Sequence, residues 1–226
     1  MKAKHTPATG EYLIRIHTLR REGQRVVWAR LAERMGVSPP AVSQALRRMA
    51  RSGLVVLDPD REVELTPQGR QEAEAILRRH YLIERLLVDE LGFDWADADE
   101  EAEKMEQSLS PRLEEHLYER LGRPTTCPHG NPFPGSPDEE RLLHARRLTD
   151  VAPNERVTLL RVTEEGEDEP DLLHVFNAHG LLPGAEVILT RLDNTSDQLD
   201  LMKQGRKVTI PARWARYVRV TGPSSL

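Results

Sequence analysis

The chain has 226 residues, of which 38% are hydrophobic and 31% charged, and its formal net charge is −5. This length allows two or three small domains, and the composition is too hydrophobic for a disordered chain. No run approaches the ~18 consecutive apolar residues of a bilayer-spanning helix, and no secretory signal pattern is present, so we expect a soluble cytoplasmic protein without membrane contact. The single cysteine excludes an intrachain disulfide bond.

Charge is distributed unevenly along the chain. Residues 1–79 carry 15 Lys/Arg and 9 Asp/Glu, a surplus of +6, whereas residues 80–226 carry 17 and 28, a deficit of −11. A basic segment at the front of an acidic chain indicates a polyanionic partner for that segment only.

Three helices are predicted in the first third of the chain. Apolar residues recur at helical intervals over residues 11–22 and 26–35, and each pattern ends at a glycine. Ser38, as the N-cap residue before two prolines, starts a third helix that ends near Gly53. Two short helices joined by a glycine-containing turn are typical of a helix-turn-helix, with the later helix as the recognition helix.

A β-hairpin is predicted after these helices. Two β-rich runs, residues 54–57 and 62–65, flank a tetrapeptide rich in turn-forming residues. This hairpin would be the wing of a winged helix-turn-helix, with Arg61 at its tip. The order and lengths of the elements favour DNA binding, and the alternative is a winged helix used for protein contacts.

On the predicted recognition helix, small and polar side chains precede the arginines. The first turns would enter the major groove, where Gln44 can pair with adenine and Pro40 can contact a thymine methyl group. The arginines would lie near the phosphate backbone. The candidate DNA-binding residues are Ser38, Pro40, Ser43, Gln44, Arg47, Arg48, Arg51 and Arg61.

A long helix is predicted from Pro67 to Leu91, and its apolar surface is broad. We expect part of that surface to form a homodimer interface, because a palindromic DNA site would require two recognition helices ~34 Å apart. Further helices are predicted over residues 97–109 and 111–122.

The segment from residue 80 to residue 120 contains 13 acidic and 4 basic side chains. Two groups of potential ligands fall on common helix faces, namely His80 with Glu84, and Asp99 with Glu103 and Glu106. Oxygen-rich ligands with one imidazole suit Mn(II) or Fe(II). The alternative is a solvated acidic face.

The last third of the chain changes character. Cys127 and His129 have the spacing of a metal-ligand pair, but the prolines around them favour a rigid turn. A helix is predicted over residues 139–148, followed by a small β-module. Its expected elements are strands at 157–163, 185–192, 197–204 and 205–220, a short helix at 172–179 and an acidic loop at 164–171.

The predicted fold class is mainly α with a small β part. We expect an N-terminal winged helix-turn-helix DNA-binding domain in residues 1–72 and an all-α dimerisation and metal-binding domain in residues 73–150. Residues 151–226 are expected to form an SH3-like β-barrel.

Three motifs after the predicted winged helix carry a resemblance to a known family. They are RRHYLIERLL, EEAEKMEQSLSPRLEEHL and CPHGNPFPG. Together they resemble the diphtheria toxin repressor family of iron- and manganese-dependent transcriptional regulators, over about residues 8–150. In that family a divalent metal bound between the first helix and the dimerisation helices closes the DNA-binding domains onto an operator. The C-terminal module is similar to the one that ends longer members and to the ferrous-iron transport accessory module.

The resemblance implies two metal sites in this chain. The first would use Glu11, Glu103, Glu106 and Gln107, and the second would use His80, Glu84 and Asp99. In iron-type relatives the C-terminal module completes the second site, which makes Glu169 and Asp171 further candidates there.

The chain departs from the family pattern at three of these positions. Gln107 and Asp99 stand where many members have histidine, and Glu103 stands where iron-type members have cysteine. A carboxylate at the last position resembles the manganese-type branch, and the departures leave hard oxygen donors in the majority. Mn(II) is therefore the first choice of metal and Fe(II) the second.

The resulting hypothesis is a homodimeric, metal-dependent transcriptional regulator that represses metal-uptake genes when it is loaded with metal. The alternative is a metal-independent winged-helix regulator that senses a small molecule. An enzyme is disfavoured, because the sequence has no nucleophile elbow, phosphate-binding glycine loop or HExxH helix.

Overall fold

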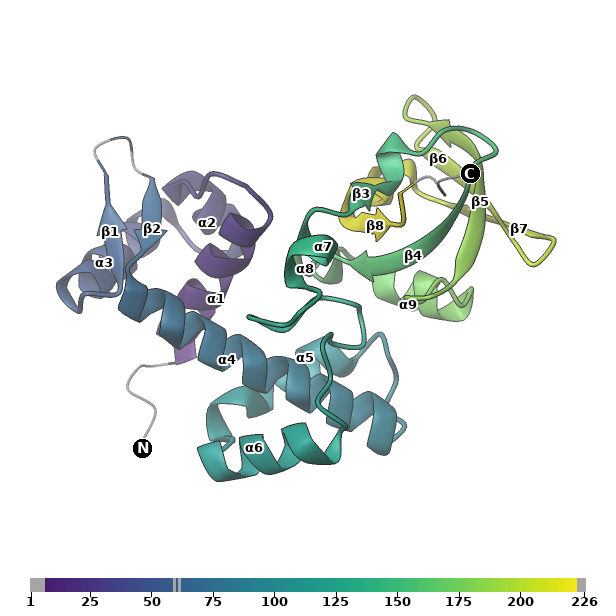
Figure 1. Cartoon of the computed structure of the whole chain (residues 1–226). Coiled ribbons are helices and arrows are strands. Elements are labelled where there is room, and N and C mark those ends of the chain that lie inside the picture. The colour runs from purple at the N-terminus through teal and green to yellow at the C-terminus, as the bar shows by residue number, and fades with distance from the viewer. Residues whose placement is uncertain (1–6, 59, 61, 223–226) are drawn as a thin grey trace. The chain divides into compact units, whose positions relative to one another are not determined.

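The computed structural model describes residues 7–58, 60 and 62–222 (Figure 1). The chain forms two compact units, one of residues 1–80 with 103–116 and the other of residues 81–102 with 117–226. Arg61, the predicted tip of the wing, lies outside the described residues.

The first unit begins with the predicted winged helix-turn-helix. Its elements are α1 (Pro7–Arg21), α2 (Trp28–Arg34), α3 (Pro39–Arg51), β1 (Val55–Leu57) and β2 (Val63–Leu65). The two strands pair antiparallel, and Figure 1 shows this hairpin beside α3. The prediction of a winged helix-turn-helix is confirmed.

A compact apolar core fixes this domain. Leu13 and Ile16 of α1, Leu46 of α3 and Val63 of β2 are each fully buried in one hydrophobic cluster. Burying such side chains stabilises the fold by roughly 1.5–3 kcal/mol each. Ser38 occupies the predicted N-cap position of α3, but its hydroxyl makes no capping hydrogen bond.

The long helix α4 (Pro67–Arg85) continues as a π-helical turn, η1 (Leu86–Glu90), so the predicted helix through residue 91 is present. Thr66 Oγ1 accepts a hydrogen bond from Gly69 N at 3.0 Å and thereby caps its first turn. The helical segments that follow are α5 (Ala98–Met105), η2 (Glu106–Ser108) and α6 (Pro111–Arg120).

Much of the α4 apolar surface is buried within the single chain, and the expectation that part of it forms a homodimer interface stays a prediction. Leu77 and Leu82 are fully buried within the single chain, and Ile83 is 1% exposed. The apolar pattern of α4 therefore reflects, at these positions, burial within the chain itself. The large apolar side chains that remain exposed on the described helical segments and their connections include Leu91, Phe93, Met105 and Leu113.

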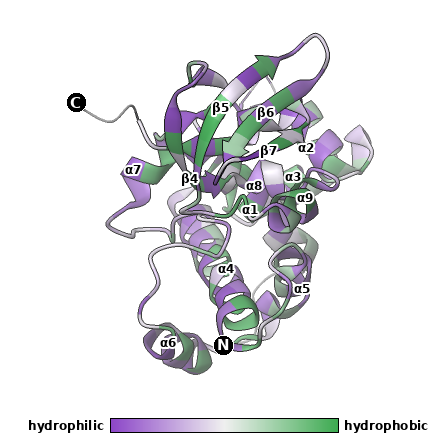
Figure 2. Ribbon diagram, turned by 90° about the vertical axis from the view of Figure 1, so that its right-hand side faces the viewer, coloured by the Kyte–Doolittle hydropathy of each residue, from purple (hydrophilic) through white to green (hydrophobic). Residues whose placement is uncertain are grey.

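The second unit contains a six-stranded antiparallel sheet in the order β3-β8-β4-β5-β6-β7. The strands are β3 (Arg146–Arg147), β4 (Arg156–Val162), β5 (Glu186–Asp193), β6 (Gln198–Lys203), β7 (Arg206–Ile210) and β8 (Val218–Val220). Figure 2 shows hydrophobic residues along β5 and β6. Leu189 and Leu201 from these strands are fully buried in one cluster with Phe176 of α9 (Leu172–Ala178).

Three predicted elements of this unit need correction. The predicted helix over residues 139–148 ends early, as α7 (Glu139–Leu143), because the next residues pair with β8 as an edge strand. The predicted strand over residues 205–220 is interrupted by η4 (Ala212–Tyr217), which follows a proline that has no N–H to donate to a ladder. The predicted acidic loop starts with a short helix, α8 (Glu164–Glu167).

None of the helices in the described part of the chain has both the length and the hydropathy required to cross a bilayer.

A tight approach of backbone to backbone holds the Cys127–Asn131 turn on the sheet. Gly130 has φ +91°, and a Cβ placed on it would lie 2.2 Å from the carbonyl oxygen of Leu160 in β4. Gly135 shares a positive φ of +74°, but a Cβ there would meet nothing within 4 Å. The two glycines have the same backbone requirement and differ in the space beside them.

We therefore predict that Gly130→Ala costs more stability than Gly135→Ala. Both variants incur the strain of a left-handed backbone, and only Gly130→Ala adds overpacking, which costs typically ~1–3 kcal/mol. Thermal and urea unfolding of the two variants measures the difference. Equal losses of unfolding free energy would show that the contact with Leu160 does not constrain the turn.

Candidate metal centres and DNA interface

One face of α3 gathers most of the predicted DNA-reading residues around an open concavity. The concavity has a volume of about 700 Å³ and is lined by Pro40, Ser43, Gln44, Arg47, Ala50, Arg51 and Leu57. Five of the eight predicted residues are among them. Side chains that can hydrogen-bond to base edges thus lie on the same face as arginines that can pair with phosphates.

Two of the other three predicted DNA contacts, Ser38 and Arg48, are not part of this lining. Ser38 is exposed just before α3, and Arg48 is exposed on α3 but is not part of the lining. The charge of Arg48 acts on Tyr12 of α1, whose pKa is raised by burial and by Glu11 and is lowered in part by this arginine. Arg61 is outside the described residues.

In the first unit, Glu106 of the first predicted metal site contacts both His80 and Gln107. Glu106 is 4% exposed, and its Oε2 lies 3.1 Å from His80 Nδ1. Gln107 Nε2 donates to Glu106 Oε1 at 3.1 Å. The same amide lies against α1, because a Cβ placed on Gly10 would be 2.8 Å from Gln107 Nε2. Gln107 therefore lies beside the residue that precedes Glu11.

The first predicted ligand set is not assembled as a compact cluster. In the described part of the chain, Glu11, Glu103 and Glu106 do not bring ligand atoms within 4.8 Å of one another. Glu103 is exposed on α5 and Glu11 is partly buried on α1. His80 contacts Glu106 of the first site, and it also offers a ligand atom within 4.8 Å of those of Glu84 and Asp99, the three residues that the sequence assigns to the second site.

The second unit contains a buried cluster that includes Cys127 and His129. Glu84, Cys127 and His129 are fully buried, each offers one ligand atom, and these atoms lie within 4.8 Å of one another. Glu84 Oε1 is 3.2 Å from His129 Nδ1, and Cys127 Sγ is 4.0 Å from the same nitrogen. Glu167 Oε1 is 3.5 Å from it, and that side chain is 2% exposed. Two carboxylates and a thiol thus surround one imidazole nitrogen.

The turn that carries Cys127 and His129 is held on three sides. Arg85 of α4 donates from Nε to the carbonyl oxygen of Thr126 at 2.8 Å and from Nη2 to that of Cys127 at 3.1 Å. Trp95 Nε1 donates to the carbonyl oxygen of Pro128 at 3.0 Å. On the sheet side, the His129 carbonyl oxygen accepts a hydrogen bond from Val162 N at 3.0 Å.

Backbone geometry also fixes the orientation of the His129 ring. Its Nε2 lies 2.9 Å from the carbonyl oxygen of Trp95, and a carbonyl oxygen can only accept, so Nε2 carries the proton. In the neutral imidazole the lone pair is then on Nδ1, which faces the carboxylates and the thiol. A backbone acceptor on the distal nitrogen is the arrangement found in metal-ligating histidines.

The electrostatics of the cluster favour a cation. Burial raises the pKa of the Cys127 thiol well above its ordinary value, and the charges of Glu84, Glu167 and Glu164 raise it further. Burial lowers the pKa of His129, but the charge and hydrogen bond of Glu84, together with the charge of Asp99, outweigh burial, and the pKa is raised. Both shifts report negative potential at this point of the structure.

The donor set therefore fits a divalent metal. Burying two carboxylates is costly unless a positive charge accompanies them, and a divalent ion supplies that charge and favours the thiolate. Carboxylate, imidazole and thiolate ligands are compatible with first-row metals such as Mn(II), Fe(II) and Zn(II). The residues present are those that such an ion requires.

Sequence reasoning found only part of this cluster. It assigned Glu84 to a metal site with His80 and Asp99, and the ligand atoms of these three residues lie within 4.8 Å of one another. It read Cys127 and His129 as a rigid turn, although their spacing was the available signal. Glu167 was missed. The two acidic residues considered instead lie elsewhere: Glu169 accepts a hydrogen bond from the Tyr217 hydroxyl at 2.5 Å, and Asp171 is exposed.

A winged helix with a polar and basic recognition face, in one chain with a buried acidic cluster suited to a divalent cation, defines the class of metal-dependent DNA-binding regulators. Three family models match the chain in order. They describe the DNA-binding domain of iron-dependent repressors (residues 4–63), their metal-binding and dimerisation domain (residues 66–135) and the FeoA domain (residues 146–222).

Known proteins resemble the chain over nearly its whole length. The iron-dependent repressor IdeR of Mycobacterium leprae is 35% identical, covering 94% of this chain and 96% of its own. The diphtheria toxin repressor of Corynebacterium jeikeium is 34% identical, covering 94% and 95%. A solved manganese-dependent transcriptional repressor in complex with manganese has a TM-score of 0.82 and 30% identity, covering 95% and 99%.

The chain belongs to the diphtheria toxin repressor family of metal-dependent DNA-binding repressors. The expected family, the absence of an enzymatic role and the small C-terminal β-module, which is an FeoA domain, are confirmed.

The face of α3 yields a prediction for DNA binding. Gln44→Ala should reduce discrimination among DNA sequences, because it removes a base-reading amide, whereas Arg47→Ala should weaken binding to all sequences and reduce the salt slope by about 1. Fluorescence anisotropy with labelled duplexes at several salt concentrations measures both effects. Arg112→Ala, an exposed charge deletion on α6, is the matched control. Unchanged discrimination in Gln44→Ala, together with unchanged affinity and salt slope in Arg47→Ala, would remove this face from the DNA interface.

Proposed function

We propose that this protein is a repressor that binds its operator when loaded with Mn(II), and with Fe(II) as the second choice. The observation that carries the choice of metal is the donor chemistry. Glu103, where iron-type relatives have cysteine, makes the first site rich in carboxylates, and hard oxygen donors suit Mn(II). One similar solved structure is that of a manganese-dependent repressor and another is that of an IdeR, whereas the similar curated proteins include an iron-dependent repressor and a diphtheria toxin repressor.

We assign the switch to the first site. Glu106 and Gln107 already lie together beside the start of α1, and Glu11 and Glu103 would complete the ligand set. A bound divalent ion supplies the positive charge that four oxygen donors need in order to approach one another. Glu11 would then connect α1 to these residues and favour the arrangement of the DNA-binding domain that fits the operator.

The second site, predicted at His80, Glu84 and Asp99, shares Glu84 with the buried cluster around His129. We propose that Glu84, Cys127, His129 and Glu167 are its ligands and that Asp99 contributes charge, as its effect on the pKa of His129 indicates. Trp95 orients the imidazole through its carbonyl oxygen. Because these residues come from α4, the Cys127–Asn131 turn and α8, metal at this site would stabilise the second unit.

The family models include a DNA-binding and a dimerisation domain, and we propose that a homodimer binds a palindromic operator in the cytoplasm. Metal-uptake genes are the proposed targets, since a repressor that is active only with metal would then close a feedback loop. The domain boundaries predicted at residues 72 and 150 remain predictions.

The test is the metal dependence of DNA binding. Duplexes are first selected from a random library by the full-length protein in Mn(II), and affinity is then measured by anisotropy across a Mn(II) titration and in chelator. Glu103→Ala should shift the Mn(II) midpoint at least tenfold, because it removes one carboxylate ligand. Glu100→Ala, which removes another exposed acid of α5, should not. Equal binding in chelator and in Mn(II) would contradict the switch, though not the DNA-binding fold.

A further inference from the structure

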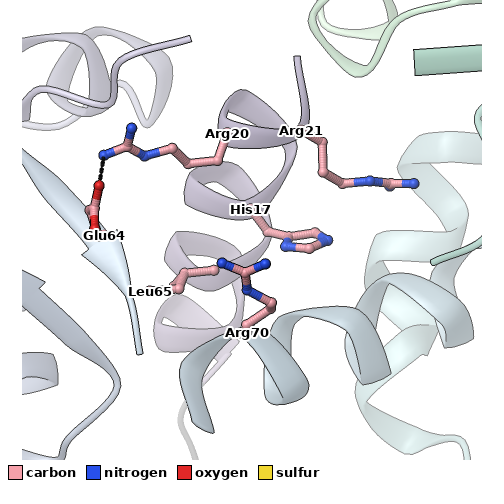
Figure 3. A pocket seen from close by; sticks show the side chains of 6 residues that line it. All are labelled: His17, Arg20, Arg21, Glu64, Leu65 and Arg70. Atoms are coloured by element: carbon pink, nitrogen blue, oxygen red, sulfur yellow. Dashed lines mark hydrogen bonds and ion pairs between the residues drawn. The ribbon is translucent and has the colours of Figure 1, made fainter. Parts of the chain in front are cut away.

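A second concave site lies on the DNA-binding domain, beside α1. It has a volume of about 310 Å³, and Figure 3 shows the side chains that line it. The lining comes from three elements that are distant in sequence: α1, the end of β2 and the first turn of α4. The residues are His17, Arg20, Arg21, Glu64, Leu65 and Arg70. They are distinct from the residues of the α3 face and from both metal sites proposed above.

Positive charge exceeds negative charge in this lining. Three arginines face one acidic residue, Glu64. Arg20 contacts that residue at 2.9 Å and also contacts Glu62 at 2.7 Å, so its charge is balanced within the protein. The guanidinium groups of Arg21 and Arg70 lie on either side of the His17 ring in Figure 3. The charges of both arginines act on His17 and lower its pKa, so the ring lies in positive potential.

His17 is a buried polar side chain that faces the cavity. It is 6% exposed, and its Nε2 is buried without a hydrogen-bond partner in the described part of the chain. Burial, with the charges of Arg21 and Arg70, lowers the pKa of His17 to about 3, so the ring is neutral near pH 7. A buried nitrogen without a partner is costly, and native structures rarely retain one unless a ligand or water satisfies it.

We propose that this cavity binds a small phosphate-bearing anion, held by the guanidinium groups of Arg21 and Arg70 and by a hydrogen bond from His17 Nε2. The planar guanidinium group presents paired N–H donors that match phosphate oxygens. A neutral imidazole with its proton on Nε2 adds a donor to the same anion. The volume is at the lower end of the ~300–1,000 Å³ range of small-molecule sites, which fits inorganic phosphate or a short phosphate monoester.

Such a ligand would link α1 to α4 across the base of the wing. The three donors belong to two helices, so the bound anion would offset the repulsion between Arg21 and Arg70 and satisfy the buried nitrogen at once. Ligand binding to the folded state alone raises its stability by mass action.

The experiment is calorimetric titration of the full-length protein with sodium phosphate at constant ionic strength, with sodium chloride as the reference titrant. The wild-type protein should show saturable binding, and Arg70→Gln should weaken it at least tenfold. Arg112→Gln, an exposed arginine of α6 outside the cavity, is the matched control and should bind as the wild type does. Arg21→Gln provides a second variant if Arg70→Gln lowers the thermal midpoint without phosphate.

Imidazole resonances supply a readout of the contact itself. Phosphate should shift the ¹⁵N signal of His17 Nε2 in the wild type and in Arg112→Gln, and not in Arg70→Gln. Heat and shifts that match the chloride reference would overturn the proposal. A DNA backbone phosphate has the same chemistry, so DNA affinity is measured in parallel. If Arg70→Gln weakens DNA binding while inorganic phosphate does not bind the wild type, the cavity serves DNA and the small-anion proposal is overturned.

Discussion

The structure of the second unit depends on one constraint, which is negative charge buried around a single imidazole. Glu84 and Glu167 approach His129 Nδ1 where water is excluded, and Cys127 adds a thiol whose pKa is raised. Isolated carboxylates do not remain charged in such a place without a counter-charge. The surrounding structure is built to keep these groups there, because Arg85, Trp95 and the close contact of Gly130 with β4 all fix the same turn.

The first metal site differs from the buried cluster because its ligands do not lie together. Its carboxylates are not gathered: Glu103 is exposed, and Glu106 is shared between His80 and Gln107. A site that is incomplete without its ion couples metal binding to a rearrangement of the residues that bind it, and a preassembled site does not. The contrast suits a division in which the buried cluster stabilises and the open one switches. Gln107 is the weakest of the expected ligands, because a neutral carboxamide offers less to a cation than the imidazole of many relatives.

The parts of the structure that local pattern and turn chemistry determine were predictable from sequence. Helix spacing, the Gly and Pro boundaries and the hairpin signal placed the winged helix within a few residues. The misses share a physical cause, which is tertiary context. Sequence does not show how much of the apolar surface of α4 the same chain buries, as it does at Leu77 and Leu82. Glu167 lies 38 residues from His129 and meets it only when α8 packs beside the turn. Cys127 and His129 were visible as a pair, but the prolines around them explained the turn equally well.

The most direct test of the buried cluster is the number of Mn(II) ions bound per chain, measured by elemental analysis after equilibrium dialysis of the full-length protein. His129→Ala removes the central ligand, and His144→Ala removes an exposed histidine of the same unit as a control. His129→Ala is expected to bind about one Mn(II) ion per chain fewer than the wild type, while His144→Ala is expected to bind the same number. Equal metal content in His129→Ala and the wild type would contradict it.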